Sequence, residues 1–261
     1  MLLDIIPLLA TGIISGVMAG LFGVGGGVII VPVLALLYQA SGVNPDVLIK
    51  VAVGTSLATI IVTSISSIRS HQRHGAVHWI SVRRMAPGIM LGALAGAFVA
   101  DAAPSKSMYL AFVIFFYTMA LRLFFGQVKA HDRVPGPVVM SGAGGIIGLV
   151  SSLIGIGGGT LNVPFLTWSG LLARQAVASA AALGFPIAIA GTAGFIFTGL
   201  DESTLPAWSL GYVHFPSFAG IAVASIFFAP IGARIAHRLP DQTLKRAFAL
   251  FLCMMATMMA I

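Results

Sequence analysis

Long apolar runs, separated by short breaks of charged, glycine or proline residues, dominate the chain. They predict ten helical segments in two sets of five, at 5–22, 32–40, 47–68, 85–100 and 106–125, and at 137–154, 164–173, 175–198, 215–233 and 243–260. The third segment of each set exceeds the ~20 residues that a helix needs to cross the hydrocarbon of a bilayer. The second segment of each set is too short to cross alone, which leaves open whether the first two segments cross fully or form a re-entrant hairpin.

The composition indicates an all-α integral membrane protein, since 58% of the residues are hydrophobic, only 8% are charged and the mean hydropathy is +1.03. A soluble domain carries about 25% charged residues, so these values exclude a soluble enzyme, a nucleic-acid binder and a disordered chain. The single cysteine, Cys253, excludes a disulfide framework and a thiolate metal cluster. All seven acidic residues fall at segment ends or in loops, so we expect no enzyme, no cofactor and no metal site.

The chain repeats itself. Residues 16–34 read GVMAGLFGVGGGVIIVPVL and residues 148–166 read GLVSSLIGIGGGTLNVPFL, with five glycines and one proline in the same register. Farther along, GAVHW at 75–79 has a counterpart in GYVHF at 211–215. These matches predict two copies of one five-segment transmembrane unit, at 1–130 and 131–261.

Twelve of the 14 Lys and Arg residues lie in loops that would share one side of the membrane. The positive-inside rule makes that side cytoplasmic, so the basic loops 69–84, 122–136 and 234–246 are expected to face the cytoplasm. The loops that follow the third segment of each half would then face opposite sides, as in the inverted repeats of secondary transporters. We therefore expect a multi-pass protein of a bacterial-type cytoplasmic (inner) membrane.

Two glycine-rich segments are the strongest local feature: GVGGGVIIVP at 23–32 and GIGGGTLNVP at 155–164. Glycines disfavour helix by about 1 kcal/mol each, the residue before a proline avoids the α region, and a proline fits the first turn of a helix. We therefore predict unwound chain at 23–31 and 155–163, each followed by a short helix. Backbone N–H groups at a helix start attract anions; the alternative is that the glycines only let helices pack closely.

The paired glycine motifs, Gly54-Thr55-Ser56 and the GAVHW element are similar to those of the sulfite exporter (TauE/SafE) family, also called the toluene-sulfonate uptake permeases. The resemblance covers nearly the whole chain. It implies a carrier of small sulfur-containing or organic anions, such as sulfite, sulfoacetate or sulfonates. One departure is that Ala180-Ala181-Ala182 stands where the second half would repeat Gly-Thr-Ser, which argues against two-fold symmetric binding of the substrate by hydroxyl groups.

We expect the anion to bind near the bilayer midplane, where backbone N–H groups of both triple-glycine runs and a few hydroxyl and amide side chains would contact it. The candidate substrate-binding residues are Gly25, Gly26, Gly27, Thr55, Ser56, Gly157, Gly158, Gly159, Thr160 and Asn162. His78 and His214 are candidates for carrying a coupled proton, because histidine titrates near neutral pH; the alternative is that they anchor the chain at the interface beside an aromatic residue. His71 and His74, in a basic loop, are expected to be solvated.

Two functions fit these features. The first is a secondary transporter that alternates access to a midplane site by rocking one half against the other. The second is an anion channel in which the same glycine-rich loops line a pore. The expected partners are a small anionic substrate and the lipid bilayer, with no nucleic acid, and the sequence leaves open whether the protein is a monomer or a homodimer.

Overall fold

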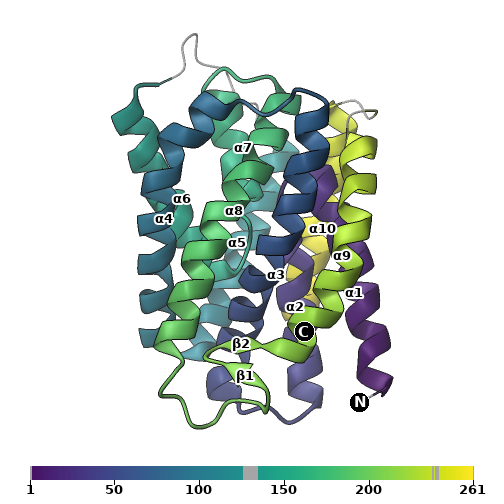
Figure 1. Ribbon diagram of the computed structural model, residues 1–261, viewed down its shortest axis with the longest axis vertical. Helices are drawn as coiled ribbons and strands as arrows, with labels where there is room; N and C mark the ends of the chain where they lie inside the picture. Colours follow the sequence, from purple (N-terminus) through teal and green to yellow (C-terminus); the bar gives the residue numbers. More distant parts are fainter. Residues whose placement is uncertain (1, 126–134, 237, 239–240, 261) are drawn as a thin grey trace.

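The computed structural model describes residues 2–125, 135–236, 238 and 241–260. Within these ranges the chain forms ten helices and one short β-hairpin (Figure 1). The first half contains α1 (Leu2–Phe22), α2 (Gly27–Ala40), α3 (Pro45–Arg73), α4 (Trp79–Ala102) and α5 (Ser105–Phe125). The second half contains α6 (Pro137–Ile154), α7 (Gly159–Trp168), α8 (Ala173–Thr198), the strands β1 (Ser209–Leu210) and β2 (Val213–His214), α9 (Phe215–Ala236) and α10 (Asp241–Ala260).

Each of the ten predicted segments corresponds to one of these helices, so the all-α prediction is confirmed. Three details of the prediction were wrong. The short helices α2 and α7 begin at Gly27 and Gly159, well before their prolines, and α7 ends at Trp168. The antiparallel pairing of β1 with β2, in which Ser209 lies opposite His214, was not predicted.

Six of the described helices are long and apolar enough to cross a membrane: α1, α3, α4, α6, α8 and α9. The helix α2 has 14 residues and α7 has 10, which at 1.5 Å per residue is roughly 15–21 Å, less than the ~30 Å of bilayer hydrocarbon. In Figure 1, α2 lies in the lower half of the bundle and α7 in the upper half. Neither short helix crosses by itself.

Helices of the first half pack against helices of the second half through glycine-rich faces. The helix α1 packs along α9, at the right of Figure 1, and α6 packs along α4, at the left. On α1, Gly12, Gly16 and Gly20 recur every fourth residue; a Cβ added at Gly16 would lie 2.8 Å from the backbone of Ser225 on α9. Small residues at this spacing let helix backbones approach closely in a membrane. Each outer pair therefore joins the first helix of one half to the last long apolar helix of the other.

The helices α3 and α8 pack against each other between these two pairs. In the most apolar 18-residue stretch of α3, 78% is buried inside the protein, whereas in that of α1 only 44% is buried. The hairpin is fastened to α4 and α3. The Tyr212 hydroxyl donates to Oδ1 of Asp101 on α4 at 2.8 Å, and Lys50 on α3 lies 3.7 Å from the same carboxylate. The core thus centres on α3 and α8, and the glycine-rich breaks approach both.

Candidate functional site

The two glycine-rich breaks touch each other in the middle of the protein. The Gly157 N–H donates to the carbonyl oxygen of Val24 at 2.9 Å. A Cβ added at Gly25 would lie 3.3 Å from the Cα of Gly157, and one at Gly159 would lie 2.5 Å from the carbonyl oxygen of Gly23. All of these residues are buried. Only glycines allow two chain segments to cross at this distance.

Each break is four residues long, at 23–26 and 155–158, which corrects the prediction of nine unwound residues. The chain turns at Gly26 and Gly158, whose φ angles of 85° and 72° lie in the left-handed region that glycine adopts without strain. The third glycine of each run is already helical, so Pro32 lies inside α2 rather than in its first turn. The left-handed glycine sets the helix start, and the later proline removes one backbone hydrogen bond without ending the helix.

The starts of α2 and α7 present backbone N–H groups without a backbone acceptor in the described part of the chain. In the described part of the chain, the N–H groups of Gly25, Gly26 and Gly27 have no backbone acceptor, and the same holds for Gly158 and Gly159. These are the N–H groups that every helix start leaves without an intrahelical partner. The helix dipole adds a partial positive charge of about half a unit at each start. The two starts therefore bring donors for an anion to one buried place.

The breaks lie at the level of the middle of α3 and α8. A Cβ at Gly25 would contact Ile60 of α3, and one at Gly155 would lie 3.1 Å from Cα of Val53. On α8, a Cβ at Gly184 would lie 3.1 Å from the carbonyl oxygen of Gly157. These contacts place the crossing segments well inside two membrane-spanning helices, not at either of their ends.

Thr55 and Ser56 are both fully buried, and both are bonded to the protein. Thr55 Oγ1 accepts the N–H of His214 at 2.9 Å, and Ser56 Oγ donates to the carbonyl oxygen of Gly155 at 2.8 Å. Ser56 therefore ties α3 to the second break, and its single hydroxyl proton is already used. The Thr55 hydroxyl also shares a side-chain hydrogen bond with Tyr38. In this arrangement both hydroxyls already have partners within the protein.

The counterpart of Thr55 in the second half is Ser179, not a residue of the alanine run. The His78 N–H donates to Ser179 Oγ at 2.9 Å, as the His214 N–H does to Thr55. The same register relates Val53 to Val177, which lie against Gly155 and Gly23 respectively. The expectation that this hydroxyl lacks a partner in the second half was wrong, and it arose from a register error of two residues. Thr55 thus holds the chain segment that precedes α9, and Ser179 holds the segment that precedes α4.

Thr160 and Asn162 are the two candidate residues whose polar atoms the protein leaves unused. Their side chains are 1% and 0% exposed, and among the described residues neither the Thr160 hydroxyl nor either polar atom of Asn162 has a hydrogen-bond partner. Both belong to the first turn of α7, directly after the second break. A Cβ at Gly158 would lie 2.7 Å from Nδ2 of Asn162. Buried polar groups without partners cost free energy, so their retention indicates a ligand or water at this place.

Sequence reasoning missed three further serines near the second break whose buried hydroxyls have no partner among the described residues. The hydroxyls of Ser64, Ser151 and Ser152 are buried and have no partner within the described chain. A Cβ at Gly158 would lie 3.2 Å from Ser151 Oγ, and one at Gly184 would lie 3.2 Å from Ser64 Oγ. The group therefore surrounds the second break rather than the first.

A comparison of the two halves would have found these residues. In the 132-residue register of the glycine motifs, the polar residues near the second break replace small or apolar residues near the first. The pairs are Ala19 with Ser151, Gly20 with Ser152, Val28 with Thr160, and Ile30 with Asn162. The first break contributes backbone donors alone, whereas the second adds hydroxyl and amide donors.

His78 and His214 lie away from the breaks, each at the start of a helix. His78 caps α4 and hydrogen bonds with Ser81, and His214 precedes α9 and hydrogen bonds with Ser217, both at 2.9 Å. The hairpin that holds His214 is bonded to the end of α4, so the two histidines lie at opposite ends of the bundle. Burial lowers the pKa of His214. The structure therefore brings His214 to Thr55 alone among the candidate residues, and it places His78 beside Ser179 at the other end of the bundle.

His71 is buried, which contradicts the expectation that it is solvated. Its Nε2 lies 3.2 Å from the carbonyl oxygen of Gly20, so it fastens α3 to α1. His74, in contrast, is exposed as expected. Of the predicted basic loops, residues 126–134, 237 and 239–240 lie outside the described part of the chain.

Comparisons with known proteins agree with this architecture. The chain is similar to the "Probable membrane transporter protein" of Haemophilus influenzae, with 39% identity over 95% of both chains. It is 28% identical to the "Probable membrane transporter protein MJ0441" of Methanocaldococcus jannaschii, over 92% of this chain and 90% of that protein. No solved structure matches it. The profile described as "Sulfite exporter TauE/SafE" matches residues 8–259, so this multi-pass membrane protein belongs to the TauE/SafE family of transporters.

Proposed function

We propose that this protein is a secondary transporter that carries small anions, of the sulfite, sulfoacetate or organosulfonate class, across the cytoplasmic membrane. The observation that supports this most is the group of unpartnered donors around Gly157 and Gly158. Backbone N–H groups, the hydroxyl of Thr160 and the amide of Asn162 offer only hydrogen bonds and helix dipoles, with no cationic side chain among them. Such a site favours a small oxyanion, which can accept several hydrogen bonds at once.

The site is asymmetric. Gly25, Gly26 and Gly27 would contribute backbone donors from one side, and Gly158 and Gly159 from the other. Gly157 would hold the two breaks together, because its N–H is donated to Val24. Thr160 and Asn162 would add directed bonds. Ser56 would act indirectly, by holding the second break through Gly155. We add Ser64 and Ser151 as further contacts, because their hydroxyls share the surroundings of Gly158 and Gly184.

Alternating access would follow from the two-fold arrangement of the halves, 1–130 and 131–261, as inverted repeats. The swapped pairs α1 with α9 and α4 with α6 are the contacts expected of such repeats. Because the breaks cross between the halves, a rocking of one half against the other would change the space between Val24 and Gly157. The basic end of the bundle would face the cytoplasm.

Flux measurements on Thr160→Val test this proposal. The unmodified protein and the variant are reconstituted in proteoliposomes, and the uptake of radiolabelled sulfite is measured over a concentration series. The control is Thr167→Val on the same helix, because Thr167 Oγ1 already donates to its own helix at Val163. Loss of a hydrogen bond to an anion should weaken apparent affinity roughly tenfold or more, with the control unchanged. Equal uptake by both variants at every concentration would contradict the site.

Electrical recording separates the transporter from the channel alternative. A transporter gives slow flux that saturates with sulfite and shows no unitary currents. A pore lined by the same glycine-rich breaks gives large unitary currents. The direct contact between Val24 and Gly157 favours the transporter, because the crossing segments fill the space through which a continuous pore would pass.

A further inference from the structure

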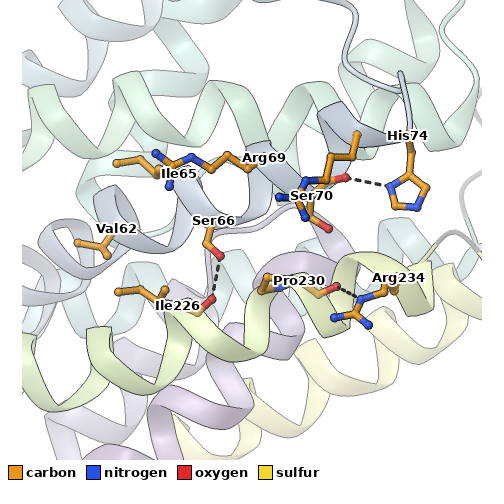
Figure 2. A pocket seen from close by; sticks show the side chains of 10 residues that line it. Val62, Ile65, Ser66, Arg69, Ser70, His74, Ile226, Pro230 and Arg234 are labelled. Carbon is orange, nitrogen blue, oxygen red and sulfur yellow. Dashed lines mark hydrogen bonds between the residues drawn. The ribbon is translucent and has the colours of Figure 1, made fainter.

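A groove of about 720 Å³ runs between α3 and α9, away from the glycine-rich breaks (Figure 2). Its lining residues are Val62, Ile65, Ser66, Arg69, Ser70, Arg73 and His74 of α3, and Ile226, Pro230 and Arg234 of α9. From Val62 to His74 it follows α3 for 12 residues, roughly 18 Å at 1.5 Å per residue. The groove thus extends from the membrane-spanning part of α3 to the basic end of the bundle.

The groove is amphipathic along its length. Val62, Ile65 and Ile226 line one end, and Arg73 and Arg234 line the other. Arg69 lies between them, and its side chain extends back toward Ile65, whereas Arg234 lies beyond Pro230 (Figure 2). None of the ten lining residues is acidic. Arg234 Nε donates to the carbonyl oxygen of Pro230 at 3.4 Å, within its own helix. The three guanidinium groups therefore meet no carboxylate within the groove.

The two helices are fixed at the apolar end of the groove. Ser66 Oγ donates to the carbonyl oxygen of Ile226 at 2.8 Å, and the hydroxyls of Thr63 and Ser225 bond each other at 2.8 Å one turn deeper. These bonds close the groove toward the middle of the protein. A ligand in the groove is thus separated from the candidate anion site.

At the equivalent place in the other pair of helices, α4 and α8, two aromatic residues stand where the groove has two arginines. In the registers that pair Thr55 with Ser179 and His78 with His214, Arg73 corresponds to Phe197 and Arg234 to Phe98. The rings of Phe98 and Phe197 pack directly, with their centroids 6.1 Å apart. If the packing of these helices required arginines, both places would have them. Among the described residues, the symmetry-related place therefore lacks the arginine pair of the groove.

We propose that this groove binds one anionic phospholipid from the leaflet at the basic end. The phosphate would sit between Arg73 and Arg234, and the acyl chains would lie along Val62, Ile65 and Ile226, where Arg69 adds a further positive charge. A small soluble anion would contact only the charged end of the groove. A phospholipid would contact the charged end with its phosphate and the apolar end with its acyl chains, and it is long enough to reach both. Basic pockets between membrane-spanning helices recognise lipid headgroups by this combination of charge and apolar contact.

Lipid titration of purified full-length protein tests the inference. Delipidated protein in a neutral detergent is titrated with phosphatidylglycerol, with phosphatidylcholine and with soluble glycerol phosphate, and bound lipid is counted by native mass spectrometry. The test variants are Arg73→Gln, Arg234→Gln and the double variant, all at exposed positions. The control is Arg83→Gln, an exposed arginine at the same end that is not among the lining residues.

Each lost arginine should weaken phosphatidylglycerol binding roughly fivefold, because a basic residue near an anionic lipid contributes about that factor. The control should keep the affinity of the unmodified protein, and phosphatidylcholine should bind weakly to all variants. Equal phosphatidylglycerol affinity in the double variant and the control would overturn the proposal. Competition by glycerol phosphate at the same concentration as the lipid would also overturn it, since the groove would then hold a soluble anion. Neither result depends on the transport activity.

Discussion

Gly157 donates its backbone N–H to the carbonyl oxygen of Val24, and this one bond of 2.9 Å joins the glycine-rich breaks of the two halves. The break in α1–α2 and the break in α6–α7 therefore form a single structural unit. A change in the position of either half must alter this crossing. The candidate anion site lies at the same residues, so the proposed anion binding and the proposed movement of the halves would involve the same contacts.

The first prediction concerns the left-handed glycines. Gly26→Ala should lower the melting temperature clearly more than Gly75→Ala. Both glycines have positive φ, so both variants carry the backbone strain of about 1–2 kcal/mol. A Cβ at Gly26 also meets the carbonyl oxygen of Ser15 at 2.8 Å, whereas nothing lies within 4 Å of one at Gly75. Thermal unfolding in detergent measures the difference, and equal losses would show that the break has room for side chains.

The second prediction tests the equivalence of Thr55 and Ser179. Thr55→Val and Ser179→Ala each remove the acceptor of a histidine N–H, at His214 and His78 respectively. An unsatisfied buried N–H costs about 1–3 kcal/mol, so both variants should be destabilised by similar amounts. Thermal unfolding of the two single variants and the double variant checks this. If only one substitution lowered the melting temperature, the two hydroxyls would not play equivalent roles.

The third prediction is a pH dependence of stability through His214. Burial lowers the pKa of His214 below its ordinary value of 6.5, so the unfolded chain binds a proton more readily than the folded one. Its contribution to stability is complete above pH 6.5 and is lost as the pH falls from there to the lowered pKa.

The control for this prediction is His214→Asn, which keeps a side chain able to cap α9 but does not titrate. Melting temperatures are compared at about pH 7.5 and about pH 5. The unmodified protein should lose more stability on acidification than the variant does. An identical loss in both proteins would assign the acid sensitivity to other groups.

The sequence predicts the helices of this fold well, because charges and glycines mark their ends. It predicts the breaks less well. Pro32 and Pro164 suggested helix starts, but the left-handed turns at Gly26 and Gly158 precede them by six residues. A proline inside a helix removes a single bond, so it marks a helix start only weakly. The β-hairpin at 209–214 escaped prediction because strands of two residues carry no alternating pattern.

The candidate site could be predicted only in part. The paired motifs identify the glycines. They do not predict that the Ser56 hydroxyl donates to the carbonyl oxygen of Gly155, because this bond depends on a contact between residues that are far apart in the sequence. The register of Ser179 was hidden because the offset between the halves falls from 132 at the breaks to 124 at α3 and α8. In contrast, Ser151 and Ser152 are visible in the sequence as polar replacements of Ala19 and Gly20.

The central claim is that an anion occupies the buried donors at the second break, and Asn162→Leu tests it most directly. Leucine keeps the branched shape of asparagine but removes both unpartnered polar atoms, so the variant should be at least as stable as the unmodified protein. Calorimetric titration of both proteins with sulfite, beside the neighbouring control Leu161→Met, measures binding. We predict a melting temperature that is unchanged or raised, together with a loss of sulfite affinity of roughly tenfold or more. Undiminished sulfite affinity in a folded Asn162→Leu protein would contradict the account.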